Sequence, residues 1–186
     1  MKLVVLASGS GTTLQAILDD PELREHVVAV GADRPGIGAL QRASDAGVDA
    51  FVVPFADYAD RAEWNRAFER ELAARGPDIV VLAGFMRIFD EQNVRRFRMV
   101  NTHPALLPSF PGVGIRAVRA ALVHGVKLTG VTVHWVDEGV DTGPIIAQAA
   151  VPVEPGDDEH SLFDRIKAAE KPLYVTTLRR LCQEIS

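Results

Sequence analysis

The sequence predicts one α/β domain built on a mostly parallel central sheet. Three observations support this fold class: the chain has 186 residues with 47% hydrophobic content, short apolar runs alternate with longer amphipathic segments, and no repeat or linker interrupts them. A chain of this length can form one substantial core but is short for two. Apolar runs separated by helical segments are typical of parallel strands with helical connections. We therefore expect a single domain over residues 1–186.

The first half of the chain predicts alternating strands and helices. Strands are expected at the short apolar runs 3–7, 27–30, 50–53, 79–82 and 99–102. Helices are expected where apolar residues recur at helical spacing, in 12–19, 37–46 and 60–74. In the last of these, Trp64, Phe68 and Leu72 recur at every fourth position. They predict a stripe packed in the core, in preference to a cofactor site.

The second half predicts a different order of elements. We expect a helix over 118–123, strands over 128–136 and 145–153, and a long helix over 158–181 that Pro172 kinks or breaks. Two strands in succession depart from the alternation of strand and helix. The whole pattern therefore predicts a Rossmann-like sheet whose later strands are mixed in direction.

Composition argues against several classes of partner. The net charge of -5 and the absence of a Lys/Arg block argue against nucleic acid. No apolar run approaches the length of a membrane span, and the single cysteine, Cys182, cannot form an internal disulfide. The N-terminus enters the run at Leu3 without a basic stretch or cleavage site, so we expect a cytoplasmic protein. The remaining histidines show no metal-ligand spacing and predict no catalytic metal: His26, His124, His134 and His160.

A glycine-rich loop, Ala-Ser-Gly-Ser-Gly-Thr-Thr at 7–13, follows the first predicted strand and opens a helix. Backbone N–H groups in such a loop face an anion. The loop is an incomplete dinucleotide fingerprint because Leu14 occupies the third glycine position, although Asp33 is suitably spaced to bind a ribose. It also lacks the Gly-Lys-Ser/Thr of nucleoside triphosphate loops. The two interpretations that remain are a phosphate monoester site and a structural turn.

Three polar residues form the strongest candidate for a catalytic site. Asn101 and His103 are two positions apart, so on a strand their side chains leave the same face, and Pro104 ends that strand. Asp141, in an Asp-Thr-Gly-Pro segment, could orient the imidazole and raise its pKa at a separation of a few ångströms. Each fragment alone also fits a structural role, since Asp-Thr-Gly-Pro is an ordinary turn sequence. Together they bring an amide, an imidazole and a carboxylate to one acyl group.

The sequence around these residues resembles the folate-dependent formyltransferases. The resemblance is carried by Asn-Thr-His-Pro-Ala-Leu-Leu-Pro-Ser-Phe-Pro-Gly at 101–112, preceded by Val-Leu-Ala-Gly-Phe-Met-Arg-Ile at 81–88. The match extends from Leu3 to about the last helix, and it is strongest to members that act on glycinamide ribonucleotide in purine synthesis. It implies a three-layer formyltransferase fold and direct formyl transfer from the co-substrate 10-formyltetrahydrofolate, without a metal. Both implied partners are small molecules, and the protein is expected to be a monomer or homodimer.

The resemblance also implies roles for individual residues. The implied catalytic residues are Asn101, His103 and Asp141. The implied ribonucleotide-binding residues are Gly11, Thr12, Thr13, Lys167 and Glu170. Folate binding falls to Arg61, Met86, Arg87, Ile88, Phe89, Asn101, Val136, Asp137, Glu138, Gly139 and Val140. Two interpretations without a binding role stay open: Lys167 and Glu170 also fit an exposed ion pair, and Arg61 also fits a solvated charge on a helix.

The chemistry of formyl transfer explains why these residue types are needed. Attack of an amine on the formyl carbon gives a tetrahedral intermediate with a negative oxygen, to which the amide of Asn101 can donate. His103 can bond the same oxygen or move a proton toward the departing folate nitrogen, and Asp141 can hold a water that accepts the amine's proton. Cys182 is expected to be packing material. His134, on the strand that leads toward Asp141, could support the catalytic residues, but a structural hydrogen bond is the favoured interpretation.

The sequence departs from the family at three places. Thr13 stands where members often carry Asn, residues 113–118 replace text that often contains histidine, and the chain stops at Ser186 where many continue. Family members that formylate methionyl-tRNA or hydrolyse the formylfolate normally carry a further domain, which 186 residues do not accommodate. The alternatives from other classes are an inactive binding protein and a nucleotide-binding redox module that uses Gly9, Gly11 and Asp33.

Overall fold

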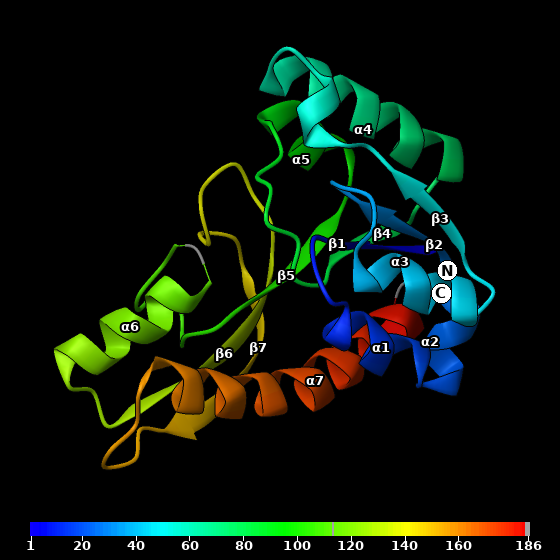
Figure 1. Cartoon of the computed structure of the whole chain (residues 1–186). Helices are drawn as coiled ribbons and strands as arrows, with labels where there is room; N and C mark the ends of the chain where they lie inside the picture. The colour runs from blue at the N-terminus through cyan, green and yellow to red at the C-terminus, as the bar shows by residue number, and fades with distance from the viewer. Residues whose placement is uncertain (113, 185–186) are drawn as a thin grey trace.

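A seven-stranded sheet forms the centre of the computed structural model, which describes residues 1–112 and 114–184 (Figure 1). Its strand order is β3-β2-β1-β4-β5-β6-β7. The strands are β1 (Leu3–Ala7), β2 (Val27–Ala32), β3 (Asp49–Val52), β4 (Ile79–Leu82), β5 (Met99–His103), β6 (Leu128–Trp135) and β7 (Ile145–Pro152). The first five pair in parallel, whereas β6 runs antiparallel to β5 and β7 antiparallel to β6. The predicted mostly parallel sheet with mixed later strands is confirmed.

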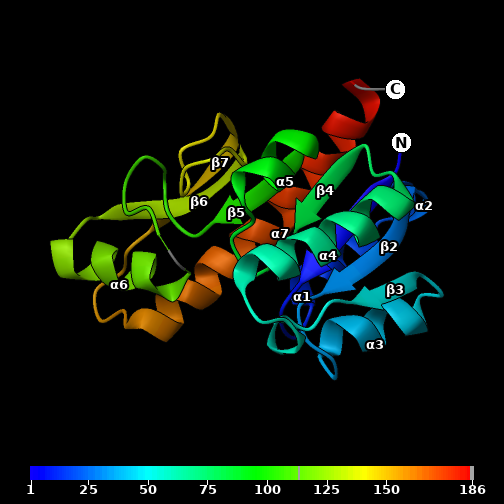
Figure 2. The same cartoon turned by 90° about the horizontal axis from the view of Figure 1, so that it is seen from above.

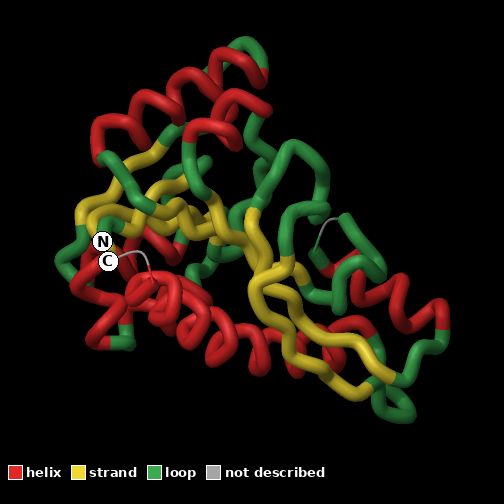
Figure 3. The backbone as a smooth tube through the Cα atoms, turned by 180° about the vertical axis from the view of Figure 1, so that it is seen from behind, coloured by secondary structure: helices red, strands yellow, loops and turns green. Residues whose placement is uncertain are grey.

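Helices cover both faces of the sheet, which gives three layers (Figures 1 and 3). One face is covered by α1 (Thr12–Leu18), α2 (Pro21–His26), α3 (Gly38–Asp45) and α7 (Glu159–Glu184). The other is covered by α4 (Arg61–Arg75) and α5 (Glu91–Arg96). The remaining helix, α6 (Ile115–His124), packs beside the start of α7 and next to β6 and β7 (Figure 2).

The sheet separates two hydrophobic cores because successive side chains on a strand point to opposite faces. In β1, Leu3, Val5 and Ala7 join the core under α1, α2, α3 and α7, while Val4 and Leu6 join the core under α4. The predicted stripe on α4 is confirmed: Trp64, Phe68 and Leu72 are all fully buried in that second core. Cys182 is buried in the first core, which agrees with its predicted packing role.

Several short elements were not predicted from the sequence. These are α2, α5 and a 3₁₀ turn over Phe55–Asp57. Both helices are six residues long and begin at an aspartate cap, where the Asp20 and Asp90 carboxylates accept from the third residue of the helix. Their length is too short for an apolar period to be visible. The first residue of the atypical segment 113–118 lies outside the described residues, and α6 begins at Ile115, before the predicted start.

Of the kink or break expected at Pro172, the break is wrong, because α7 continues through it from Glu159 to Glu184. Proline removes one backbone hydrogen bond from a helix interior. Buried side chains on both sides of it, Ile166 before and Tyr174 and Leu178 after, pack against the same sheet. Tertiary packing of both halves therefore holds the helix together.

The strand order fixes where a ligand can bind. Parallel strands of this kind bind ligands in the crevice beyond their carboxyl ends, where the chain connections change direction. Here β1 is followed by the glycine loop at 8–11, β4 by the segment 83–90, and β5 ends at His103. All three predicted site segments therefore meet at one edge of the sheet. Over the described ranges, no helix is long and apolar enough to cross a membrane.

Candidate active site

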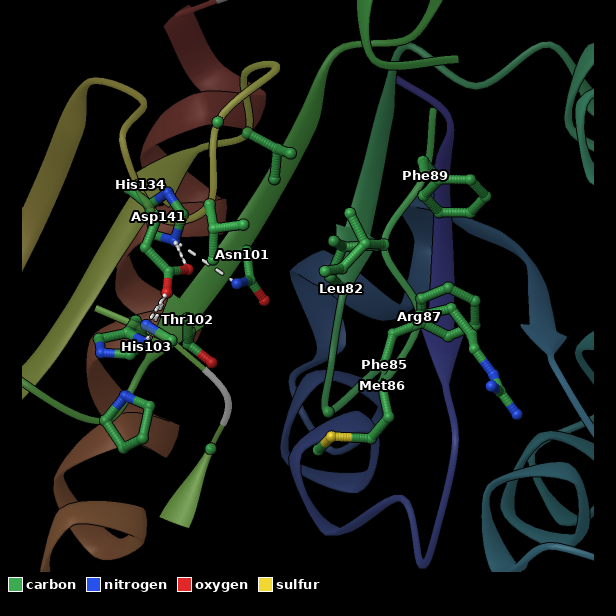
Figure 4. Close-up of a pocket in the computed structure, with 18 of the residues that line it drawn as sticks. Leu82, Phe85, Met86, Arg87, Phe89, Asn101, Thr102, His103, His134 and Asp141 are labelled. Carbon is green, nitrogen blue, oxygen red and sulfur yellow. Dashed lines mark hydrogen bonds and ion pairs between the residues drawn. The ribbon is translucent and has the colours of Figure 1, made fainter. Parts of the chain in front are cut away.

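Asn101 and His103 lie at the end of β5, next to the antiparallel strand β6. Asn101 is opposite His134 in the register, and His103 is opposite Thr132. His103 is 2% exposed and Asn101 is half-buried. The strand ends at His103, and Pro104 follows, as predicted. Both side chains therefore leave one face of the strand at its carboxyl end (Figure 4).

Asp141 reaches His103 from the loop between β6 and β7. The Asp141 Oδ2 atom lies 3.2 Å from His103 Nδ1, which confirms the predicted proximity (Figure 4). The same oxygen accepts a 2.8 Å hydrogen bond from the backbone N–H of Gly112. Asp141 has a φ of 56°, an uncommon value for a residue with a side chain. The carboxylate thus joins the imidazole to the loop after β5, and the uncommon φ of Asp141 adds backbone strain.

Burial determines the protonation of His103. Burial is the largest effect on this ring, and the pKa of His103 lies below its ordinary value although the Asp141 charge and the Phe110 carbonyl act in the opposite direction. The expectation that Asp141 raises this pKa therefore holds for its own contribution but not for the net shift. His103 Nε2 lies 2.8 Å from the Phe110 oxygen, so both ring nitrogens face an acceptor. A neutral ring can donate to only one of them.

His134 completes a connected set of polar groups. Its Nδ1 atom lies 2.9 Å from the backbone oxygen of Trp135. Its Nε2 atom lies 3.4 Å from Asn101 Nδ2 and 3.5 Å from Asp141 Oδ1. The ring is 2% exposed. The structural hydrogen bond predicted for His134 is present, and the ring also contacts two of the three catalytic candidates.

One cavity connects the catalytic candidates with most of the predicted binding residues. Its lining is shared by predicted and unpredicted residues. The predicted ones are Met86, Arg87, Ile88, Phe89, Asn101, His103, Val136, Asp137, Glu138, Gly139, Val140, Asp141, Lys167 and Glu170. Four predicted residues do not line it: Gly11, Thr12, Thr13 and Arg61. A mostly apolar cavity with a few convergent polar groups is typical of small-molecule sites.

The segment after β4 forms the apolar wall of this cavity. Phe85 and Phe89 line it, and behind it both rings stack on the buried ring of Trp64. Met86 and Ile88 are 58% and 53% exposed, so two large apolar side chains stand open to solvent at its edge. This wall can accept a flat aromatic ligand and gains area when it is covered.

Two arginines predicted to bind folate differ in their surroundings. Arg87 lines the cavity, its Nε atom donates to Asp33 Oδ2 at 2.7 Å, and its guanidinium lies over the Phe55 ring. Arg61 instead donates to the backbone oxygens of Ile88 and Phe89, at 2.6 and 3.2 Å. Arg61 therefore braces the segment after β4 from outside the cavity.

Asp33 is committed to arginine partners. Its carboxylate accepts from Arg34 at 3.0 Å and from Arg87 at 2.7 Å, and the residue is 1% exposed. Burial alone would raise the pKa of this carboxyl, but the hydrogen bonds from Arg34, Arg87 and Ser8 hold it below its ordinary value. A ribose-binding acid needs free lone pairs, so these contacts argue against the redox alternative.

Thr13, Lys167 and Glu170 form one polar cluster between α1 and α7. The Thr13 hydroxyl donates to Glu170 Oε1 at 2.9 Å, and Lys167 Nζ lies 2.9 Å from the same oxygen. Glu170 is 2% exposed and Thr13 is 4% exposed. The pair of Lys167 and Glu170 is therefore not an exposed ion pair, because its carboxylate is buried. The Thr13 hydroxyl therefore donates its hydrogen bond to another residue of the protein, whereas the sequence suggested it as a donor to a ligand.

The glycine loop is held by α3. Gly11 has a φ of 73°, and a Cβ there would lie 2.7 Å from the Ala39 Cα atom. The Ala39 N–H donates to the Gly9 oxygen at 3.1 Å, and Arg42 Nε donates to the Ser10 oxygen at 2.9 Å. These contacts turn the Gly9 and Ser10 carbonyls toward α3. Because the peptides are trans, the N–H groups of Ser10 and Gly11 point the opposite way.

The loop between β6 and β7 is braced by its own side chains. Asp137 accepts from Thr142 Oγ1 at 2.6 Å and from the Gly139 N–H at 3.1 Å. Glu138 accepts from Arg95 on α5 at 2.9 Å. Val140 is 49% exposed at the cavity. This loop carries Asp141, so the bracing contacts also position the catalytic candidate.

Sequence reasoning missed several contributors to the site. For His134 a structural hydrogen bond was favoured over a role in supporting the catalytic residues, Phe85 was not singled out, and Arg42 was not considered. The position of His134, seven residues before Asp141 on a predicted strand beside β5, was the available signal. Arg42 carried none, since its contact depends on how α3 packs. Among the described residues, no group of three or more His, Cys, Asp or Glu side chains could hold a metal ion.

The comparisons with known proteins agree with this fold. A family model described as formyl transferase matches residues 1–178, so the chain belongs to the formyl transferase family. Phosphoribosylglycinamide formyltransferase of Mycobacterium tuberculosis (strain ATCC 25618 / H37Rv) is 50% identical over 184 residues, which cover 97% of this chain and 84% of that protein. Human trifunctional purine biosynthetic protein adenosine-3 is 39% identical and is matched over 96% of this chain and 18% of its own length.

Solved structures of the same family are closely similar. The crystal structure of glycinamide ribonucleotide transformylase 1 from Symbiobacterium toebii has a TM-score of 0.93 and 45% identity, and covers 99% of this chain and 88% of that one. Phosphoribosylglycinamide formyltransferase from Bacillus halodurans has a TM-score of 0.92 and 36% identity, with coverage of 100% and 97%. The predicted formyltransferase fold is confirmed.

Proposed function

We propose that this chain transfers a formyl group from 10-formyltetrahydrofolate to the amine of glycinamide ribonucleotide, a step of purine synthesis. The observation that carries the proposal is one cavity that Asn101, His103 and Asp141 line together with most of the folate-binding candidates and with Lys167 and Glu170. The names of the relatives support the same reaction. The acceptor and the donor are small molecules, and we propose that the protein acts in the cytoplasm as a monomer or homodimer without a metal.

The folate is proposed to occupy the part of the cavity between the segments after β4 and after β6. A pterin is flat and carries hydrogen-bonding edges, so it needs apolar walls and backbone groups. Phe85, Phe89 and Val140 supply the walls, and the backbone of 86–89 and 136–140 supplies the polar groups. The Arg87 guanidinium is the cation at this end for the carboxylate tail, and Arg61 holds the wall in shape.

The ribonucleotide is proposed to bind at the other end, between the glycine loop and α7. The backbone N–H groups at 11–13 and the Lys167 ammonium suit a phosphate monoester. Glu170 lines the cavity, and its carboxylate is proposed to accept from ribose hydroxyls. Thr13 supports this end indirectly, because its hydroxyl anchors Glu170.

The reaction between these two ends needs no covalent enzyme intermediate. The amine nitrogen attacks the formyl carbon, and the carbonyl electrons move to the oxygen. The bond from carbon to the folate N10 nitrogen then breaks, and the carbonyl re-forms. One proton leaves the amine and one reaches N10. Asn101 is proposed to donate to the negative oxygen, and loss of one such donor typically costs about a hundred- to a thousandfold in rate.

His103 and Asp141 are proposed to manage the protons and the oxygen charge. The lowered pKa keeps the His103 ring neutral near pH 7, so it can accept a proton as charge develops. Asp141 stabilises the charged ring from 3.2 Å away. Asp141 also lines the cavity, and its Oδ1 atom is proposed to accept a proton from the amine directly or through water.

The test is an absorbance assay for deformylation of a 10-formyl folate with glycinamide ribonucleotide as acceptor. The expected result is turnover that requires both substrates. Deformylated folate formed without the acceptor would favour a hydrolase. No product with or without the acceptor would reject the proposal. Saturable NAD binding, measured by fluorescence, would instead support the redox module, which the engaged carboxylate of Asp33 disfavours.

A further inference from the structure

The proposed function leaves open which end of the Asn101 amide faces the reacting carbonyl. A primary amide has a donor nitrogen and an acceptor oxygen of similar size, and rotation about its last bond exchanges them. Only the N–H end stabilises a negative oxygen, while the C=O end would repel it. A neighbour with a fixed hydrogen-bonding character is therefore needed to hold the amide in its useful orientation.

His134 has such a fixed character. Its Nδ1 atom lies 2.9 Å from the backbone oxygen of Trp135, and a carbonyl can only accept, so the proton of the neutral ring is on Nδ1. The Nε2 atom of that tautomer carries a lone pair and no proton. It is therefore an acceptor, and it is held in place because the ring is buried on β6.

Asn101 is the residue that can donate to this acceptor. Its Nδ2 atom lies 3.4 Å from His134 Nε2, and the two residues are paired across β5 and β6. Figure 4 shows the amide nitrogen turned toward His134 and the amide oxygen turned away from it. One N–H of the amide meets His134, which leaves the second N–H for another acceptor.

Asp141 adds an independent constraint. Its Oδ1 atom lies 3.5 Å from the same Nε2 atom, and within the described residues only Oδ2 receives a backbone donor, from Gly112. With a bare Nε2, the carboxylate gains no hydrogen bond from His134, so Oδ1 stays available as a proton acceptor. A protonated Nε2 would donate to Oδ1 and would turn the Asn101 oxygen toward itself. Both changes would work against formyl transfer.

We propose that His134, through an acceptor at Nε2, is a positioning residue that selects the donor end of the Asn101 amide and leaves Asp141 Oδ1 free. The proposal rests on the proposed function, since it assigns a role within that reaction. It differs from a purely structural role because the ring must accept at Nε2. A side chain that fills the same space without an acceptor should preserve the fold and lose rate.

The first test compares His134→Leu with His134→Gln. Leucine removes the acceptor, and glutamine can offer its side-chain oxygen to Asn101. We expect kcat of His134→Leu to fall by about ten- to a hundredfold, short of the loss of the donor itself, with KM for both substrates little changed. His134→Gln should recover much of this loss. Equal loss in both folded variants, or an unchanged kcat in His134→Leu, would overturn the proposal.

A matched control and a double variant separate positioning from damage to the strand. Thr129 is also buried on β6, and its hydroxyl has no partner among the described residues, so Thr129→Val should retain full kcat. In the Asn101→Ala background, His134→Leu should cost almost nothing more, because the amide that it orients is gone. Full additivity of the two losses would contradict the proposal.

A spectroscopic measurement needs no turnover at all. The ¹⁵N NMR shifts of His134 should show a protonated Nδ1 and an unprotonated Nε2 at the pH of the assay. A protonated Nε2 would overturn the assignment, whatever the chain catalyses. Conversely, an inactive wild-type chain with the expected tautomer would reject the proposed function and leave the orientation of Asn101 standing.

Discussion

The Nδ1 atom of His103 lies 3.2 Å from the Oδ2 atom of Asp141, although one residue is on a strand and the other is in a loop that follows a different strand. His103 ends β5, whereas Asp141 follows β6 in a left-handed backbone conformation. The Gly112 N–H and the Phe110 oxygen bind the two groups from the loop between them. The pair is therefore held by three segments, and its geometry should be insensitive to the loss of any one weak contact.

The substitution Asp141→Asn should lower the pKa of His103 further and reduce turnover strongly. The carboxylate charge raises this pKa against the larger effect of burial, so removing the charge leaves burial less opposed. An NMR titration of the ring measures the pKa, and a steady-state assay measures kcat. A rise in the His103 pKa, or full activity, would contradict the assigned electrostatic role.

His103 should also make the protein less stable as the pH falls. Its native pKa is lowered, so below the ordinary value of about 6.5 the unfolded chain binds a proton more readily than the folded chain. The His103 contribution is fully present above about pH 6.5 and is lost as the pH falls toward the native pKa. Urea unfolding of the wild type and His103→Gln at several pH values isolates this contribution. A wild-type advantage that grows on acidification would show that the sign is wrong.

Replacing Asn101 should affect the chemical step more than substrate binding. Asn101→Ala should reduce kcat by about a hundred- to a thousandfold, since it removes a donor that acts mainly on the negative oxygen. Single-turnover measurements with both substrates bound test the chemical step directly. If the variant instead showed unchanged kcat with a raised KM, Asn101 would be a binding residue.

The cluster of Thr13, Lys167 and Glu170 should control the ribonucleotide and not the folate. Lys167→Ala removes the cation, and Thr13→Val removes the hydroxyl that anchors Glu170 at 2.9 Å. Both should raise KM for glycinamide ribonucleotide by about tenfold or more, as expected for losing a charged contact or a buried hydrogen bond. Lys171→Ala, on the same helix, is the matched control. Unchanged affinity in both variants would remove the phosphate site from this cluster.

Thr132 should stabilise the loop that follows His103. Its buried hydroxyl donates to the Ala105 oxygen at 2.7 Å and accepts from the Leu107 N–H at 3.0 Å. Thr132→Val leaves these groups without a partner and should lower the free energy of unfolding by about 1–3 kcal/mol. Thr129→Val on the same strand is the control, because that hydroxyl has no partner in the described structure. Equal losses of unfolding free energy in the two variants would contradict the stabilising role of the Thr132 hydrogen bonds.

Much of the fold follows from local pattern. The apolar runs of β1 and β4 and the stripe of Trp64, Phe68 and Leu72 are periodic enough to predict, and each is buried as expected. Two helices escaped prediction because they are one to two turns long and begin at Asp20 and Asp90 caps. The break at Pro172 was wrong for the opposite reason, since long-range packing overrides the local cost of proline.

The site was predictable only where residue type and spacing carried the chemistry. Asn101, His103 and Asp141 have such a pattern, and their proximity was expected. The net pKa shift of His103 was not, because burial depends on the packing of the β5 and β6 strands around the ring. The bracing role of Arg61, the capture of the Thr13 hydroxyl by Glu170, and the contacts of His134 depend on distances that no sequence period encodes.

The most direct test of the central claim is rapid-quench measurement of formyl transfer in the wild-type chain, with 10-formyltetrahydrofolate and glycinamide ribonucleotide both saturating. The account predicts formylated ribonucleotide and deformylated folate in equal amounts, and a severe loss of both in the folded Asp141→Asn variant. Folate deformylation without a formylated ribonucleotide, or equal transfer by that variant, would contradict it.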